Sequence, residues 1–507
     1  MFGTHRLASS GGTAARQTRH RGVAAATALL GAAAILFSTG GGAALGQSPA
    51  PSVTPAPTPF SGGVASVPPG VTLVRWFCCL GAGDDPLQVK VEQAVVDQFN
   101  ASHSNIQIAF EGVPYLGASD ALATEIASGN PPDIVGPVGI GGANAFGDQW
   151  LDLKPLIDAA GYDLSQYDQS AVDLYRIGDQ QVGIPFAIYP SELWFKRSMF
   201  DEIGLAYPPQ KYGEKYTMPD GSVVDWNYDT VRKLGLLLTV DRNGKDATDP
   251  AFDATQITQY GFEPQRDDLR GLAASWQAGS LVAPDGKTVQ IPAAWEAAWK
   301  FLYDGIWKDH FIMSGPVFQR PEIAGGSGNP FCSGTIAMDL NFLWSTYCLG
   351  DAGDDWDLAA VPSYEGQTTA AFNADTFRIM KGSQHPDEAF EVLTYLLGDA
   401  SPQLLQIYGG MSARPDQQQG FFDTLTTSFT TSSGTPVTLQ QTPDWQVAID
   451  GVQYADNPNF ESAMPHYNES LDILTKYQTR WTSTPGLDMD AEIAQLTADL
   501  QAVWDKQ

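Results

Sequence analysis

The chain has 507 residues, with 28 Lys and Arg against 58 Asp and Glu, and a formal charge of −30. A surface this anionic repels the phosphates of nucleic acids and of anionic lipids, so neither is expected as a partner. Hydrophobic residues make up 43% of the chain and charged residues 17%, which excludes a disordered protein. A chain of this length predicts about two or three domains.

The first 46 residues have the pattern of a secretory signal peptide. They contain four arginines and no acid, then an apolar run from Val23 to Phe37 and small residues before Gln47. We expect cleavage before Gln47, and an uncut signal anchor is the alternative. Cleavage removes the four arginines and takes the formal charge from −30 to −34. No later apolar run reaches the about 18 residues that span a bilayer.

Residues 47–70 are rich in Pro, Ser and Thr and predict an extended tether. In lipoproteins such a stretch follows a lipid-modified Cys, but this chain has Gln47 at that place, which argues against a lipid anchor. The expected location is therefore periplasmic, cell-surface or extracellular.

Four cysteines in an exported chain favour disulfides. We expect Cys332 to pair with Cys348, which closes a short loop, and Cys78 to pair with its neighbour Cys79. Two buried thiols at 78 and 79 are the alternative. The cysteines lack zinc-ligand spacing and the six His are scattered, so we expect no metal site.

Strand and helix patterns alternate after the tether. Residues 71–76 and 106–110 alternate as strands, and a third strand begins at Asp133. Between them lie a helix face at a spacing of four (Leu87, Val91, Val95, Phe99) and a helix from an N-cap at Ser119 to a stop at Gly129. This order predicts a parallel sheet whose ligand loops follow the strands. Those loops are Cys78–Asp85, Gly112–Gly117 and Gly136–Ala143.

Three later stretches predict amphipathic helices, at 295–306, 389–397 and 493–503. The ranges 207–260 and 417–442 are polar and rich in turns, and we expect surface insertions there.

Catalytic and cofactor motifs are missing. The sequence has no P-loop, HExxH or GxSxG, and Asn144 occupies the last position of the near match to GxGxxG that begins at Gly139. The calcium-like run from Asp241 to Asp246 has its Gly at the wrong position and predicts a turn. No pair of acids is singled out for glycoside hydrolysis. We therefore predict no enzyme and no cofactor.

Several stretches in the range 71–504 resemble the sugar-binding, maltose-binding-protein-like family of bacterial extracellular solute-binding proteins, the receptors of ABC importers. The most specific is Phe331-x-x-Gly334-x-x-Ala337-Met338 followed by Trp344. The others, in family order, are ASGNPPDI at 127–134, LDLKPLI at 151–157, GIPF at 183–186, LWFKRSMF at 193–200, WDLAAVP at 356–362, PDEAF at 386–390, GMSAR at 410–414 and Met464-Pro465.

The resemblance implies the two-lobe α/β fold of periplasmic binding proteins, class II-like, with a doubly wound sheet in each lobe. It places lobe one at 71–188 plus 363–410 and lobe two at 189–362 plus 411–507. The chain then crosses the hinge near 187–190, 362–367 and 408–412. A disulfide between the early and late cysteines would obstruct hinge opening, which supports the two local pairs.

The ligand is expected in the cleft between the lobes. A neutral sugar needs carboxylates and amides for its hydroxyls and aromatic rings for its C–H faces. The matched family position makes Trp344 the first candidate, as a ring that stacks on sugar. The other candidates are Trp76, Tyr189, Glu192, Asp84, Asp85, Trp276, Asp375 and Arg414. For Trp76 and Trp276 core packing is an equal alternative, and Arg414 would bind ligand or pin the hinge. A Cys78–Cys79 ring would form an apolar plate at the cleft mouth.

The expected function is a monomeric receptor that captures a carbohydrate and delivers it to an ABC transporter permease. The alternatives are a secreted polysaccharide hydrolase or lyase, and the same fold with a polyamine or a phosphorylated polyol as ligand. In maltose receptors the loop after the third strand carries aromatic and charged residues, whereas residues 136–142 are small and apolar, so the maltodextrin ligand is not transferred.

Overall fold

A computed structural model describes residues 60–61, 67–81, 83, 86–264, 268–325, 329–353, 355–425, 428–430, 435–439, 441–456 and 459–506. The chain divides into Met1–Pro55 and Ala56–Gln507, and only the second unit contains described residues. The expected signal peptide, most of the tether, and Asp84 and Asp85 lie outside them. Within the described part, no helix is long and apolar enough to cross a bilayer.

The predicted β-α-β-α-β order is confirmed. Its elements are β2 (Thr72–Cys78), α1 (Pro86–Ser102), β3 (Ile106–Gly112), α2 (Tyr115–Ala127) and β4 (Ile134–Val138). The strand β2 pairs in parallel with both β3 and β4, as crossover helices require. The start of α2 differs from the expectation, because the helix begins directly after Pro114, whose fixed φ suits the first turn, and Ser119 lies inside it.

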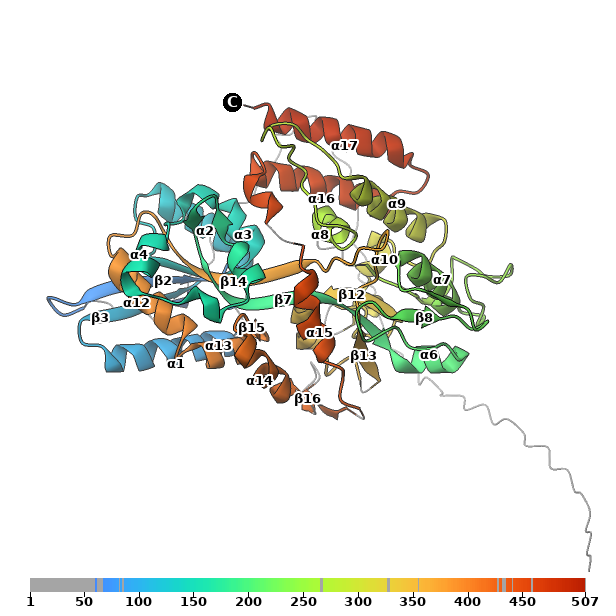
Figure 1. Cartoon of the computed structure of the whole chain (residues 1–507), viewed down its shortest axis with the longest axis horizontal. Coiled ribbons are helices and arrows are strands. Elements are labelled where there is room, and N and C mark those ends of the chain that lie inside the picture. The colour runs from blue at the N-terminus through green and yellow to red at the C-terminus, as the bar shows by residue number, and fades with distance from the viewer. Residues whose placement is uncertain are drawn as a thin grey trace, which may run out of the picture. The chain divides into compact units, whose positions relative to one another are not determined.

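One long strand, β7 (Ile184–Lys196), connects the two halves of the sheet (Figure 1). Its first part pairs with β14 (Phe372–Ile379) and β15 (Met411–Ser412), and its second part with β12 (Met338–Phe342) and β13 (Trp356–Ala359). The path through the sheet is β1-β3-β2-β4-β14-β7-β12, where β1 is Phe60–Ser61. All 13 residues of β7 are buried, so side chains must cover both of its faces.

The three predicted amphipathic helices are present as α9 (Ala293–Trp307), α12 (Pro386–Leu397) and α17 (Met489–Trp504). In Figure 1, α1 and α12 lie on the face of the sheet opposite α2 and α3 (Ile140–Ala145). The other longer helices are α4 (Lys154–Ala160), α6 (Arg197–Ile203), α7 (Tyr228–Leu238), α13 (Ser401–Tyr408), α14 (Pro415–Leu425) and α16 (Tyr467–Ser483).

The remaining elements are short. The helices are α5 (Gln169–Asp173), α8 (Leu269–Ala274), α10 (Gly315–Phe318), α11 (Pro321–Ala324) and α15 (Gln446–Gly451). The two-stranded sheets join β5 (Arg176–Ile177) to β6 (Gln180–Gln181), β8 (Lys215–Thr217) to β9 (Val223–Asp225), β10 (Val240–Asp241) to β11 (Ile257–Gln259), and β16 (Ser428–Thr430) to β17 (Pro436–Thr438). Single 3-10 turns are η1 (Gly147–Gln149), η2 (Leu164–Gln166), η3 (Leu343–Cys348), η4 (Val452–Tyr454) and η5 (Phe460–Ala463).

The range 207–260 is more than the surface insertion expected from its polarity. Its helix α7 buries Tyr228, Val231, Leu234 and Leu238 in the hydrophobic core of the second half of the chain. The apolar residues are few but recur at helical spacing, so one face of α7 packs inward while the hairpin β8–β9 remains largely exposed.

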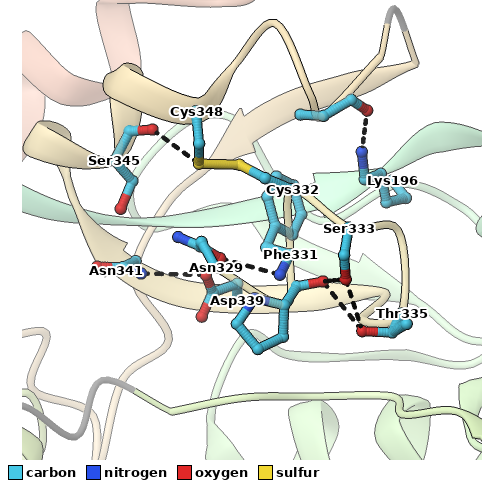
Figure 2. The surroundings of a disulfide bond; sticks show 12 residues. Lys196, Asn329, Phe331, Cys332, Ser333, Thr335, Asp339, Asn341, Ser345 and Cys348 are labelled. Atoms are coloured by element: carbon cyan, nitrogen blue, oxygen red, sulfur yellow. Dashed lines mark hydrogen bonds between the residues drawn. A yellow bond between two sulfur atoms is a disulfide. The ribbon is translucent and has the colours of Figure 1, made fainter. Parts of the chain in front are cut away.

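Both expected disulfides are present. Cys332 precedes β12 and Cys348 ends η3, so their bond brackets the segment that carries Trp344 (Figure 2). Cys348 also lies beside the Ser345 carbonyl, at 3.3 Å. Cys78 is bonded to Cys79, and both are fully buried. The expectation that this ring lines the cleft mouth is therefore wrong, because Glu92 and the Gly83 backbone enclose the sulfurs.

A buried acid lies in the middle of the sheet. Asp375 in β14 is 8% exposed, and its oxygens lie beneath Gly81 and Gly139, which follow β2 and β4. The Tyr189 hydroxyl donates to its carboxylate at 3.5 Å. Burial raises the pKa of Asp375 to about 7, against the opposing effect of the Tyr189 hydrogen bond.

Removal of the Cys332–Cys348 bond should lower stability without unfolding the protein. The bond closes a loop with a sequence separation of 16. The loss of this constraint on the unfolded chain costs about 3 kcal/mol. The double variant Cys332→Ser/Cys348→Ser should therefore unfold at lower urea, measured by circular dichroism. An unchanged midpoint would show that the two cysteines are not bonded in the protein.

Asp375→Asn should remove a pH dependence of stability. In the wild type the carboxyl is protonated in both states below about pH 4, and the free energy of unfolding falls as the pH rises toward 7, because the buried group must ionise. The full fall is roughly 4 kcal/mol. In urea titrations, the variant should therefore gain stability relative to wild type between about pH 5 and about pH 8.

Asp158→Asn is the matched control for that experiment. Its side chain is 63% exposed, so it corrects for the loss of one negative charge from an anionic protein. An effect of Asp375→Asn that is the same at both pH values would contradict the role assigned to burial.

Candidate functional site

A small cavity lies at the carboxyl end of the parallel strands. Its volume is about 70 Å³. One wall comes from Ile140 and Gly141 of α3, which follows β4 in the loop Gly136–Ala143 that the sequence predicts as a ligand loop. The full lining is Ile140, Gly141, Asp268, Arg270, Gly271, Leu281, Phe342, Asn373, Glu461, Tyr467, Leu471 and Leu474.

Arg270 is the centre of a buried charge cluster on one side of the cavity. Asp268 caps α8 by accepting from the Gly271 backbone N–H, which places Arg270 in the first turn. Its guanidinium donates to Asp456 at 2.5 Å and to Oε1 of Glu461. Asp456 also accepts from the Phe372 backbone N–H at 2.8 Å. One cation therefore holds two carboxylates from a distant part of the chain.

Burial and charge act against each other in this cluster. Burial raises the pKa of Asp456 to about 7 and raises the pKa of Glu461, while Arg270 lowers both. For Arg270, burial opposes the charged form, and the two carboxylates more than offset it, so the pKa of the guanidinium is raised. The arrangement keeps a guanidinium charged where water is largely excluded.

Glu461 lines the cavity, and only one of its carboxylate oxygens is hydrogen-bonded to a described residue. Its Oε1 accepts from Arg270, whereas its buried Oε2 finds no hydrogen-bond partner in the described part of the chain. The residue lines the cavity together with Asn373 and Tyr467. Since a buried acceptor without a donor costs about 1–3 kcal/mol, a ligand hydroxyl or ammonium group at Oε2 would be favoured.

Aromatic rings adjoin the polar groups. Phe342 lines the cavity, and the ring of Trp344 packs on it with centroids 4.1 Å apart. The Tyr189 ring also contacts Trp344, with centroids 5.6 Å apart. Trp344 is only partly buried and lies one residue into η3, next to the cavity wall. Its role as a sugar-stacking ring stays a prediction.

Trp76 and Trp276 are core residues, so of the two alternatives left open by the sequence core packing holds and the role in the cleft is wrong. Trp76 is fully buried, and its indole N–H donates to the Gly136 carbonyl at 2.6 Å. Both faces of β2 are covered, which leaves no open side at the strand end. Trp276 is 5% exposed and stacks on Tyr228 with centroids 4.4 Å apart.

Glu192 does not face the cavity. In β7 it follows Ser191, which pairs with the cavity residue Phe342. Successive strand residues point to opposite faces, so Glu192 lies on the other side of the sheet. It is fully buried, its carboxylate oxygens have no hydrogen-bond partner among the residues described, and burial raises its pKa well above the ordinary value.

Arg414 hydrogen-bonds two other parts of the chain and does not line the cavity. It donates to the Leu397 carbonyl at 2.9 Å and to the Tyr167 hydroxyl at 3.1 Å. Of the remaining candidates, Tyr189 and Asp375 are hydrogen-bonded to each other, and neither lines the cavity.

Sequence reasoning missed most of the polar lining. Tyr467 follows the Met464-Pro465 motif by two residues, which was a usable signal. Asn373 lies two residues from Asp375 on the same strand. Arg270, Asp456 and Glu461 lie in stretches without a motif, and only folding brings them together.

The cavity suits a ligand without negative charge. Asp268 and Glu461 supply carboxylates, and Arg270 is already engaged by two acids. In the part of the chain that the structure describes, the metal-ligating groups that come together are Cys78, Cys79 and Glu92, and the two sulfurs are bonded to each other.

Comparison with known proteins places the chain in a family. A family model described as bacterial extracellular solute-binding protein matches residues 85–401, more than half of the chain. No curated protein matches it.

Three solved structures show the same fold. An ABC substrate-binding protein from Listeria monocytogenes, in complex with cycloalternan, is 16% identical with a TM-score of 0.63, and the match covers 86% of this chain and 100% of that one. The sugar-binding protein MalE from Xanthomonas citri is 15% identical with a TM-score of 0.62, covering 85% and 97%. A cyclic α-maltosyl-1,6-maltose binding protein from Arthrobacter globiformis is 15% identical with a TM-score of 0.60, covering 86% and 99%.

These likenesses confirm the two-lobe α/β fold expected from the sequence. With the match over residues 85–401, they establish that the chain belongs to the bacterial extracellular solute-binding protein family.

Proposed function

We propose that this protein is an extracytoplasmic receptor that binds a sugar or oligosaccharide and delivers it to the permease of an ABC transporter. The observation that carries the proposal is the set of residues that line one cavity: Glu461, whose Oε2 has no partner among the described residues, with Asn373, Tyr467 and Phe342. Hydroxyl groups and flat C–H faces of a sugar match these groups. Structural relatives that bind cycloalternan and cyclic maltosyl-maltose support this ligand class.

The size of the cavity supports a hinge motion. Ligand pockets typically have volumes of about 300–1,000 Å³, far more than the about 70 Å³ found here. A sugar can enter only if the walls separate. We place the lobes at 71–188 plus 363–410 and 189–362 plus 411–507, with hinge crossings near 187–190, 362–367 and 408–412. Periplasmic binding proteins are a known example of such closure.

The receptor acts as a monomer without catalysis in this proposal, in the periplasm or at the cell surface. A polyamine is the second ligand class, since the lining carboxylates favour cations. A phosphorylated polyol fits less well, because Arg270 is engaged by Asp456 and Glu461.

Neutral sugars should raise the melting temperature in a screen of mono- and oligosaccharides, with polyamines as a parallel set. A ligand at 100 times its Kd adds about 2.7 kcal/mol of stability.

Glu461→Gln should weaken sugar binding by roughly 10- to 100-fold, because a hydrogen bond to a carboxylate contributes about 1.5–3 kcal/mol. Calorimetric titration measures the affinity.

Asp456→Asn is the control for that variant, because it also disturbs the ion pairs of Arg270 but does not line the cavity. It should lower stability with a smaller loss of affinity. If only polyamines raise the melting temperature, the proposed ligand class is wrong. If the protein converts a sugar to a product, it is an enzyme and not a receptor.

Trp344→Ala should weaken sugar binding by about 0.5–1.5 kcal/mol or more, through loss of a ring at the cavity wall. Trp76→Phe is the matched control, since Trp76 is a core residue. That variant should lower the unfolding midpoint and leave the calorimetric Kd unchanged. If the two variants change Kd equally, the role of Trp344 in sugar binding is contradicted.

A further inference from the structure

Two asparagines far apart in the sequence bond to each other beside the cavity. Asn144, at the end of α3, donates from Nδ2 to Oδ1 of Asn459 at 3.2 Å. Asn459, just before η5, donates from Nδ2 to Oδ1 of Asn144 at 3.1 Å. Each amide thus satisfies a donor and an acceptor of the other, and Asn459 is only 8% exposed. This reciprocal geometry requires α3 and η5 to lie together.

The amide pair is at the edge of the cavity and not in its lining. Gly141 lines the cavity three residues before Asn144, and Glu461 lines it two residues after Asn459. Tyr467, which lines the cavity, lies at the start of α16. A Cβ at Gly141 would lie 3.9 Å from the Tyr467 hydroxyl, so α3 packs closely against the start of α16. The Asn144–Asn459 pair therefore joins the segment of α3 that lines the cavity to the segment of η5 that lines it.

We infer that the Asn144–Asn459 pair is a latch that holds the cavity closed, in the absence of ligand as well as with it. The two asparagines fall in the two lobes proposed above, so the inference rests on that lobe assignment. A ligand larger than the present cavity can enter only when α3 separates from η5 and α16, and this separation breaks both amide hydrogen bonds. Asn144 and Asn459 act as positioning residues, because they set how long the walls stay together without touching the ligand.

The pair is uncharged, which gives the latch a defined response to charge. Two neutral hydrogen bonds shift the equilibrium between open and closed forms by roughly 5- to 100-fold. Negative charges at both positions would repel each other at this short distance, whereas one negative and one positive charge would attract. A contact that merely fills space would not distinguish these two combinations.

The test compares two double variants without any ligand. Asn144→Asp/Asn459→Asp should open the cavity, and Asn144→Asp/Asn459→Lys should keep it closed. Small-angle scattering measures the radius of gyration, and hydrogen exchange measures protection of the backbone amides in α3 and α16. We expect a larger radius and faster exchange for the Asp/Asp variant, by roughly 5- to 100-fold in α3, and wild-type values for the Asp/Lys variant.

Asn468→Asp is the matched control, since it adds one charge at an exposed position on the same helix, α16. It should change neither measurement. Circular dichroism establishes that every variant is folded, and the milder pair Asn144→Ala/Asn459→Ala replaces Asp/Asp if that variant does not fold. Equal radii and equal exchange for Asp/Asp, Asp/Lys and wild type would overturn the latch.

A second arm adds maltotriose and cycloalternan and separates this inference from the proposed function. If neither sugar raises the melting temperature of the wild type while the Asp/Asp variant has the larger radius, the latch is supported and these two sugars are not its ligands. If the sugars bind and the Asp/Asp variant keeps the wild-type radius, the proposed receptor function is supported and the latch is contradicted.

Discussion

The complete burial of one shared strand is the constraint on which the rest of the structure depends. All 13 residues of β7 are buried, and the strand hydrogen-bonds to β14 and β15 along its first part and to β12 and β13 along its second. Segments from four distant parts of the sequence must therefore converge on it. The same convergence brings Phe342 and Asn373, which flank β7 on either side, to one cavity.

Buried acids gather around this strand, which is unexpected on energetic grounds, because ionised carboxylates are costly away from water. Asp456 and Glu461 are compensated by Arg270. Among the described residues, the carboxylate of Asp375 accepts a hydrogen bond from Tyr189 alone, and the carboxylate of Glu192 accepts none. Removal of Arg270 would leave two uncompensated acids, and such losses typically cost about 3–5 kcal/mol. The cation is thus part of the fold as much as of the cavity.

Local patterns predicted the parallel strands, the amphipathic helices and the loop that supplies Ile140 and Gly141, because periodicity and strand order are properties of neighbouring residues. The pairing of Cys332 with Cys348 was also local. Arg270 lies 186 residues from Asp456 and 191 from Glu461, and no motif marks them. A tryptophan at a strand end gives no sign of whether that end is covered, which is why the sequence leaves core and cleft as equal alternatives for Trp76, a residue that the structure places in the core.

Closure and recognition are physically linked at Glu461. In the proposed hinge motion, opening would expose the Glu461 carboxylate to water, whereas in the closed form Oε2 finds no donor among the described residues. Empty closure therefore carries a cost of about 1–3 kcal/mol, which is comparable to the gain from two neutral amide hydrogen bonds. A ligand hydroxyl at Oε2 removes the cost and leaves the gain of the Asn144–Asn459 pair intact. In this scheme the amide pair holds the empty protein closed by a small margin. A ligand that donates to Oε2 favours the closed form further, and a ligand without a donor at that position does not.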